Sequence, residues 1–229
     1  MNKLPLFITP RYRAIELAIN DIGLVQTFYR ENPEFWVTVA NKTPSDQIAR
    51  DEFFATGNPS VPRGKKWRIG FFDGNNALAA ISYIFSDFFA KNVWHIELFI
   101  VATALHGTGA SREIYDQLES WVLHQNGCGL RLGVVDGHTK ARRFWEKNGY
   151  MPLGKWKGGA AGVSLTIQLM VKLLKNISLM QYFKLVPNDL QGYCKASELQ
   201  PALVGYNRPA IQDINRLAYG GSYRRTAWY

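Results

Sequence analysis

A glycine-rich turn in front of a helical pattern is the part of this sequence whose residue types most directly suggest chemistry. The turn is formed by Gly107, Thr108, Gly109, Ala110 and Ser111. A turn that opens a helix presents unpaired backbone N–H groups at the positive end of the helix dipole. Phosphate is the natural ligand of such a site. The turn therefore predicts a site for a phosphorylated cofactor, although an ordinary strand-to-helix turn has the same composition.

The residues of the turn exclude two common nucleotide-binding motifs. The dinucleotide-binding fingerprint needs a third glycine at position 112, where this chain has Arg112. The phosphate-binding loop of ATP- and GTP-binding proteins ends in Gly-Lys-Ser/Thr, and the turn contains no lysine. A different phosphorylated ligand is therefore expected.

The hydrophobic pattern around the turn predicts a mixed α/β fold with helices on both faces of the sheet. Because strands 94–101 and 130–135 are joined by a helix, they are expected to be parallel. The helix expected after Pro44 should direct the side chains of Phe53 and Phe54 toward the core. Helices are expected after Asp21, Pro44 and the glycine turn, and from Thr139. Strands are expected over residues 13–19, 67–73, 77–85, 94–101, 130–135, 150–153 and 163–174.

The composition sets wide limits on the class of protein. The chain has 229 residues, of which 47% are hydrophobic, so it can bury a sizeable core. The net charge of +9 suits an acidic ligand, a nucleic acid or a basic surface, but the bases are scattered. Cys128 and Cys194 form no disulfide framework, and the four histidines lack metal-site spacing, so no metal is expected. No signal-peptide core or membrane-length apolar run is present, which favours the cytoplasm.

A second segment, residues 138–150, contains an alanine, a phenylalanine, a glycine and an aromatic residue at motif spacing. These are Ala141, Phe144, Gly149 and Tyr150. Together with the glycine turn and the order of elements over about residues 13–174, they resemble the GNAT superfamily of acyl-CoA-dependent N-acetyltransferases. The chain departs from the two family motifs at four positions, which are His106, Ser111, His138 and Trp145.

The resemblance implies that the phosphorylated ligand is acetyl-CoA, used as a co-substrate. Its pyrophosphate would lie on the N–H groups of residues 107–111, and its pantetheine amides would pair with strand backbone near residues 99–101. Arg112, Lys140, Arg142 and Arg143 are candidates for the adenosine phosphates. The expected cofactor-binding residues are Phe99, Ile100, Val101, His106, Gly107, Thr108, Gly109, Ala110, Ser111, Arg112, His138 and Phe144.

The resemblance also implies direct transfer of the acetyl group to an amine, which must first lose a proton. Glu97 is the expected general base, because it is the one carboxylate in an apolar strand that runs into the turn, and His95 is second. By alternation Glu97 should share a face with His95, Phe99 and Val101. A surface position or a pairing with a nearby arginine is the structural alternative. Since Trp145 replaces the usual motif tyrosine, Tyr150 is the expected general acid. Tyr115 and Tyr83 are the next candidates for this role.

The acceptor site is expected around the first helix and the connection that follows it, at Tyr29, Phe35 and Trp36, unless these side chains belong to the core. The acceptor could be an amine-bearing small molecule or a peptide, and aminoacyl-tRNA is not excluded. Residues 1–174 are expected to form the acetyltransferase domain. Residues 175–229 form a basic C-terminal extension that could pack on the domain or make a subunit contact in a homodimer. A non-catalytic CoA-binding module and a basic nucleic-acid-binding protein are the alternatives.

Overall fold

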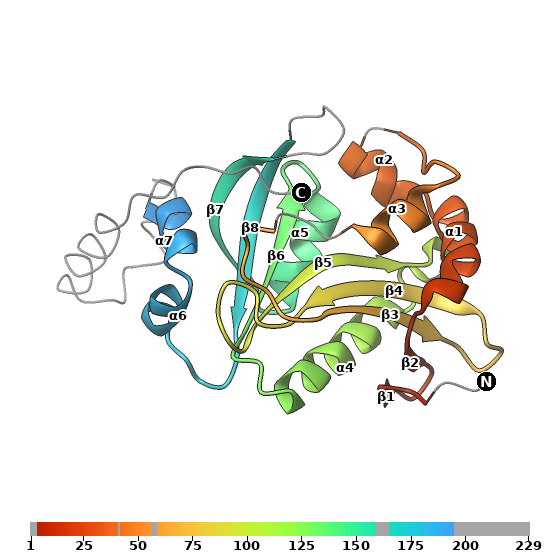
Figure 1. Cartoon of the computed structure of the whole chain (residues 1–229), viewed down its shortest axis with the longest axis horizontal. Coiled ribbons are helices and arrows are strands. Elements are labelled where there is room, and N and C mark those ends of the chain that lie inside the picture. The colour runs from red at the N-terminus through yellow and green to blue at the C-terminus, as the bar shows by residue number, and fades with distance from the viewer. Residues whose placement is uncertain (1–3, 41, 56–58, 159–164, 195–229) are drawn as a thin grey trace. The chain divides into compact units, whose positions relative to one another are not determined.

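The computed structural model describes residues 4–40, 42–55, 59–158 and 165–194. The chain divides into two compact units, Met1–Cys128 and Gly129–Tyr229 (Figure 1). Each unit combines strands with helices, so both have the α/β composition that the hydrophobic pattern predicts.

The first unit contains five strands, each antiparallel to the next. The strands expected over residues 67–73 and 77–85 form a hairpin, in whose turn the Asp73 carboxylate accepts hydrogen bonds of 2.9 Å from the N–H groups of Asn75 and Ala77. The first long strand is shorter than expected and ends at Glu16, because a 3-10 helix begins at Ile19. The strands are β1 (Phe7–Ile8), β2 (Arg13–Glu16), β3 (Lys66–Phe72), β4 (Leu78–Phe85) and β5 (Val93–Val101).

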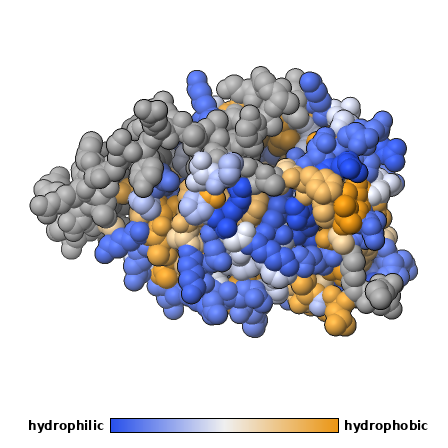
Figure 2. Space-filling model, viewed as in Figure 1, coloured by the Kyte–Doolittle hydropathy of each residue, from blue (hydrophilic) through white to orange (hydrophobic). Residues whose placement is uncertain are grey.

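The helices of the first unit are α1 (Ile22–Glu31), α2 (Glu34–Ala40), α3 (Ile48–Phe54) and α4 (Ala110–His124). The helix expected after Asp21 is confirmed as α1. The expectation that residues 35–37 form a connection is wrong, because they belong to α2. The inward position expected for Phe54 is also wrong, since this residue is 50% exposed at the C-terminal end of α3. On the face of the molecule shown in Figure 2, apolar side chains gather over α1.

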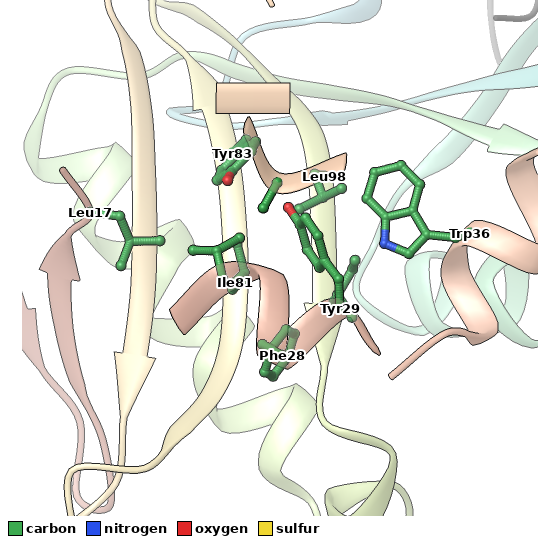
Figure 3. Packing of buried hydrophobic residues seen from close by; sticks show 10 residues of the cluster. Leu17, Phe28, Tyr29, Trp36, Ile81, Tyr83 and Leu98 are labelled. Carbon is green, nitrogen blue, oxygen red and sulfur yellow. The ribbon is translucent and has the colours of Figure 1, made fainter. Parts of the chain in front are cut away.

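Two apolar clusters hold these helices on the strands of the first unit. In one, α1 and α2 pack on β4 and β5 through Tyr29, Trp36, Tyr83 and Leu98 (Figure 3). In the other, Trp121 of α4 makes edge-on or tilted ring contacts at 5.2 to 5.7 Å with aromatic rings of β1, β3 and β5. Helices therefore cover both faces of these strands.

The second unit contains β6 (Gly129–Val135), β7 (Met151–Gly158) and β8 (Leu165–Leu173), with β8 antiparallel to both others. The helix expected from Thr139 is α5 (Thr139–Lys147), and Gly149, with φ of 86°, supplies the left-handed residue that follows it. The extended segment expected at 150–153 is part of the longer strand β7. Residues 163 and 164 of the last expected strand lie outside the described residues.

Two helices of the C-terminal extension pack into this second unit. They are α6 (Leu179–Leu185) and α7 (Pro187–Cys194). The Arg131 guanidinium of β6 donates two hydrogen bonds, of 3.0 and 3.2 Å, to the Asp189 carboxylate, which also accepts the Tyr182 hydroxyl. The side chains of Arg131 and Asp189 are 6% and 1% exposed. Within the described ranges, no helix is both long and apolar enough to cross a membrane.

Candidate active site

The glycine turn has the backbone geometry that an anion site requires. Gly107 and Gly109 have φ values of 80° and 85°, in the left-handed region that favours glycine. Gly109 is the residue before α4, and the N–H groups of Arg112 and Glu113 both donate to its carbonyl. The N–H groups of Gly107, Gly109 and Ser111 take part in none of the hydrogen bonds found among the described residues. They are available to an anion.

The space above the turn is open. A Cβ built on either Gly107 or Gly109 would have nothing within 4 Å, and residues 107–109 are exposed. Two hydrogen bonds fix the turn to the residues that precede it. His106 contacts the Val101 carbonyl at 3.1 Å, and the Thr108 hydroxyl donates to the Leu105 carbonyl at 2.7 Å. A rigid and accessible turn of this kind fits a phosphate-bearing ligand.

The first turn of α4 is fixed to the N-terminal hairpin. Glu113 accepts hydrogen bonds from the Thr9 hydroxyl at 2.7 Å and from Arg11 Nε at 2.6 Å. Burial opposes its ionisation, but these two partners lower the pKa of Glu113 below its ordinary value. Arg112 points elsewhere and pairs with Asp116 at 2.8 Å on the exposed surface of the helix.

A β-bulge lies at the expected general base. Tyr83 of β4 is opposite Leu98 of β5, but the next residue, Ile84, is opposite Ile96, so Glu97 is the extra residue. A bulge re-aims side chains and is common beside active sites. Phe99 packs against Tyr115 of α4 on one face. Glu97 instead lies on the face covered by α1 and α3, with Leu98. The expectation that Glu97 shares a face with Phe99 and Val101 is therefore wrong, because simple alternation does not continue through a bulge.

Glu97 is bound to a buried lysine rather than to an arginine. Lys66 Nζ lies 2.6 Å from Glu97 Oε2, and the two side chains are 7% and 23% exposed. The same ammonium donates to the main-chain carbonyls of Glu52 at 3.3 Å and Ala55 at 3.5 Å. Lys66 thus joins β3, β5 and the C-terminal end of α3. Lys66 was not among the expected site residues, since a lysine at the start of a strand carries no motif.

A second carboxylate, Glu52 of α3, faces the same cluster. Burial, followed by the charge of Glu97, raises the pKa of Glu52 from 4.5 to about 6, against the opposing charge of Lys66. Glu52 was not expected at the site either, because an acidic side chain between apolar helical positions is normally a solvated surface group. The long-range packing of α3 gives Glu52 its environment.

Two buried tyrosine hydroxyls complete the cluster. Burial raises the pKa of Tyr29 well above 10 and that of Tyr83 to about 12, and each phenol also feels the charges of Glu52 and Glu97. Tyr29 and Trp36 were expected to line the acceptor site, but both are core residues, with ring centroids 5.0 Å apart. Phe35 is partly buried and packs on Trp36 at 5.1 Å. The hydroxyls of Tyr29 and Tyr83 and the Trp36 Nε1 are buried without a hydrogen-bond partner among the described residues.

The expected site residues of the second unit lie just before α5, within it and just after it. His138 immediately precedes this helix, after Gly137 with φ of 87°. It lines a pocket of about 250 Å³ together with residues 134–137, Thr139, Arg142 and Gln168. Arg142 is engaged by Glu146 at 2.8 Å on the helix surface. The first turn of α5 thus offers a second polar, accessible helix start.

The expected general acid is buried. Tyr150 lies just before β7, with its ring 5.2 Å from that of Trp145, and the Tyr150 N–H donates to the Trp145 carbonyl. Phe144 is partly buried and contacts Trp145 at 4.9 Å. Trp145 itself is 7% exposed, so the indole that replaces the motif tyrosine serves as a packing residue of the second unit.

The structure gathers the expected residues only in part. In the first unit it places Phe99, Ile100 and Val101 at the end of β5, which a 3-10 helix (Thr103–Leu105) joins to the turn, and Glu97 lies close enough to Tyr29 for its charge to act on the phenol. His95 stacks on Phe88 at 4.4 Å. The described residues contain no group of three or more His, Cys, Asp or Glu side chains that could hold a metal ion.

Comparison with known proteins identifies this arrangement of strands, turn and helix as that of an acetyltransferase. The model of the acetyltransferase (GNAT) family matches residues 25–150, more than half of the chain. The chain belongs to the GNAT acetyltransferase family. No curated protein sequence matches it.

Solved structures share the fold at low sequence identity. An acetyltransferase from Thermus thermophilus has a TM-score of 0.56 and 15% identity, covering 73% of this chain and 100% of that one. Spermidine N-acetyltransferase from Vibrio cholerae, in complex with CoA and spermine, has a TM-score of 0.54 and 14% identity, covering 71% and 95%. The ribosomal-protein-S18-alanine N-acetyltransferase from Escherichia coli has a TM-score of 0.52 and 10% identity, covering 73% and 97%. At these identities the likeness establishes the fold alone.

Proposed function

We propose that this protein transfers the acetyl group of acetyl-CoA directly to a primary amine. The observation that carries the proposal is the open, left-handed glycine turn before α4 in a chain of the GNAT family. Coenzyme A carries a pyrophosphate, and the unpaired N–H groups of Gly107, Gly109 and Ser111 suit it. The structurally related spermidine enzyme, solved with CoA and spermine, is consistent with an amine acceptor.

The residues that would hold the cofactor are those of the turn and of the strand before it. Residues 107–111 would bind the pyrophosphate, with Thr108 and His106 keeping the turn in shape. The backbone of Phe99, Ile100 and Val101 would offer hydrogen bonds to the pantetheine amides. His138 and Phe144 are proposed from the family motif, just before the first turn of α5 and within that helix in the second unit.

The chemistry requires a neutral amine, a donor for the carbonyl oxygen and a proton for the leaving thiolate. An alkyl amine with a pKa near 10.4 is neutral in only about one molecule in 2,500 at pH 7, so a positioned base is valuable, worth roughly 10² to 10⁴ in rate. Two carboxylates, Glu97 and Glu52, are near the bulge of β5. A backbone N–H of β5 would bind the oxygen, and Tyr150 is proposed to protonate the thiolate.

The proposal is tested by acetyl-CoA consumption with a panel of amines. We suggest spermidine, N-α-acetyl-lysine, phenethylamine and a peptide with an N-terminal alanine, with release of the CoA thiol as the signal and product mass as confirmation. Transfer to any of these amines supports the proposal. A thermal shift with CoA gives an independent measure of cofactor binding. No shift at millimolar CoA, together with no thiol release, would refute it.

A non-catalytic CoA-binding protein is the second candidate, and one observation favours it. Trp145, in the place of the motif tyrosine, is a buried packing residue that cannot act as a phenolic acid. This candidate predicts a clear thermal shift with CoA but no thiol release with any amine. The two measurements together therefore separate the candidates.

A further inference from the structure

The carboxylate of Glu97 is already engaged, which leaves open the question of where the proton of the acceptor amine goes. Lys66 Nζ is 2.6 Å from Glu97 Oε2, and the lysine is held in place by two main-chain carbonyls at the C-terminal end of α3. This contact with a fixed ammonium occupies the carboxylate oxygen that would otherwise be free to approach an amine. Glu97 is therefore committed to positioning Lys66.

Glu52 is the other carboxylate in this cluster, and its situation differs. It is only partly buried, and no ion pair or hydrogen bond of its side chain is found among the described residues. Its own main chain contacts the Lys66 ammonium, so Glu52 and Glu97 approach the same cation from α3 and from β5. Glu52 and Glu97 thus lie in different environments, because Glu97 is paired with Lys66 and Glu52 has no ion pair among the described residues. Such a difference allows two carboxylates to take different roles.

The charged and titratable groups around Glu52 come from every element packed on it. Lys66 and Arg68 lie on β3, Tyr83 on β4, Glu97 on β5 and Tyr29 on α1, while Asp51 is its neighbour on α3. The guanidinium of Arg68 is directed to the Phe53 carbonyl and packs on the Phe53 ring. Glu97 and Asp51 make protonation of Glu52 easier, whereas Lys66 makes it harder.

We propose that Glu52 is the catalytic residue that takes the proton from the acceptor ammonium, and that Lys66 and Glu97 act as positioning residues. The inference rests on the proposed acetyltransferase function. The ammonium gives one proton to the Glu52 carboxylate and becomes a neutral amine. Its lone pair forms the C–N bond to the thioester carbon, and the C–S bond breaks. The leaving thiolate receives a proton from the general acid of the proposed function, and that acid regains a proton when the nitrogen loses its second one. Glu52 returns its proton to water.

The cluster predicts a specific pH behaviour of kcat/KM. Glu52 must be ionised to accept a proton, so the rate should rise with pH through a midpoint near the pKa of about 6 of the free enzyme. Replacing Glu97 by Gln removes a negative neighbour, which moves this midpoint to lower pH. Replacing Lys66 by Met removes a positive neighbour, which moves it to higher pH. The two substitutions are therefore expected to shift the midpoint of the pH profile in opposite directions.

The experiment measures kcat/KM from pH 5 to pH 9 for the full chain, with acetyl-CoA and spermidine or whichever amine of the panel reacts fastest. The variants are Glu52→Gln, Glu97→Gln, Lys66→Met and the control Asp51→Asn, which removes an exposed carboxylate from the same helix. Glu52→Gln should lower kcat/KM at pH 7.5 by about 100-fold or more. It should also abolish the acidic limb of the pH profile, which is the fall of kcat/KM below about pH 6. Asp51→Asn should keep the rate at pH 7.5 and the fall of the rate at acidic pH, with the midpoint of that fall moved slightly to lower pH. Thermal unfolding and CoA binding confirm that each variant is folded.

The outcomes separate this inference from the function on which it rests. In one outcome, the wild-type protein transfers the acetyl group while the acidic limb is kept in Glu52→Gln and lost in Glu97→Gln. That result would overturn the role of Glu52 but would still support the acetyltransferase function. Failure of the wild-type protein to acetylate any amine would overturn both. If Glu52→Gln is misfolded, the variant Glu52→Asp, which keeps the carboxylate, replaces it in the test. Glu52→Asp should show the acidic limb of the pH profile, and a folded Glu52→Asp without this limb would contradict the proposal.

Discussion

The ammonium of Lys66 lies 2.6 Å from the carboxylate of Glu97, and the lysine side chain is almost fully buried. A buried ion pair contributes little compared with an apolar pair, but removing one partner leaves an uncompensated charge. Because Lys66 also binds carbonyls at the C-terminal end of α3, this pair connects a helix to two strands of the first unit.

Lys66→Met should therefore lower the free energy of unfolding by about 3 kcal/mol, since Glu97 is left partly buried and unpaired. The double variant Lys66→Met with Glu97→Gln should lose less than the sum of the two single variants. Lys65→Met is the control, because Lys65 pairs with Glu16 at 2.8 Å on the surface, where such a pair is worth less than about 1 kcal/mol. Urea unfolding measures all four; strict additivity would contradict the coupling.

Glu52→Gln should make the protein more stable at neutral pH. A raised pKa means that between pH 4.5 and about 6 the folded state keeps a proton that the unfolded state has released. The free energy of unfolding of the wild type therefore falls as pH rises through this window, by at most about 2 kcal/mol. Gln does not titrate, so the advantage of Glu52→Gln should grow from pH 4.5 to pH 7. A difference independent of pH would contradict the raised pKa of Glu52.

Asp189→Asn should destabilise the second unit by about 3 to 5 kcal/mol, because it leaves the buried Arg131 charge without its partner. Asp136→Asn is the matched control: Asp136 pairs with Lys155 at 3.1 Å, but both side chains are more than 40% exposed. Its cost should be below about 1 kcal/mol. Equal losses of unfolding free energy for the two substitutions, measured in urea, would contradict a special contribution of the buried Arg131–Asp189 pair to stability.

Gly109→Ala should weaken CoA binding as well as stability. An alanine at φ of 85° costs about 1 to 2 kcal/mol, and relief of that strain would rotate the N–H groups of the turn. Gly23→Ala is the control, since Gly23 lies within α1 with nothing within 4 Å of a built Cβ, and the change should stabilise that helix by up to about 1 kcal/mol. The measurement is the thermal shift with and without CoA; an unchanged CoA shift in Gly109→Ala would exclude the turn from the site.

Much of the fold could be predicted because its signals are local. The turn before α4, the hairpin at Asp73 and the C-terminal end of α5 each depend on glycine, asparagine or aspartate at positions that only certain backbone angles allow. Helix α2 was missed because it directly follows Asn32-Pro33 and is aromatic, which resembles a loop with a hydrophobic patch. The start of α3 was placed too early, since Pro44 and Ser45 are good helix-starting residues.

The candidate site was harder to predict, because its determinants are long-range. The bulge at Glu97 depends on the pairing of β4 with β5 and leaves no mark on the alternation of residue types. The partners of Glu97 lie 31 and 45 positions away, at Lys66 and Glu52, and only the packing of α3 brings them together. Tyr29, Phe35 and Trp36 were predicted as candidate acceptor-site residues, but their sequence could not distinguish a substrate contact from the core to which Tyr29 and Trp36 belong.

The pairing of Arg131 with Asp189 also sets an order of events during synthesis of the chain. Arg131 leaves the ribosome 58 residues before the carboxylate that neutralises it. Until then the Arg131 guanidinium of β6 lacks the Asp189 carboxylate, at a position that becomes buried in the finished unit. The packing around Arg131 should therefore be completed only when α7 emerges, and a chain ending at Leu174 would lack the Asp189 carboxylate that neutralises this guanidinium.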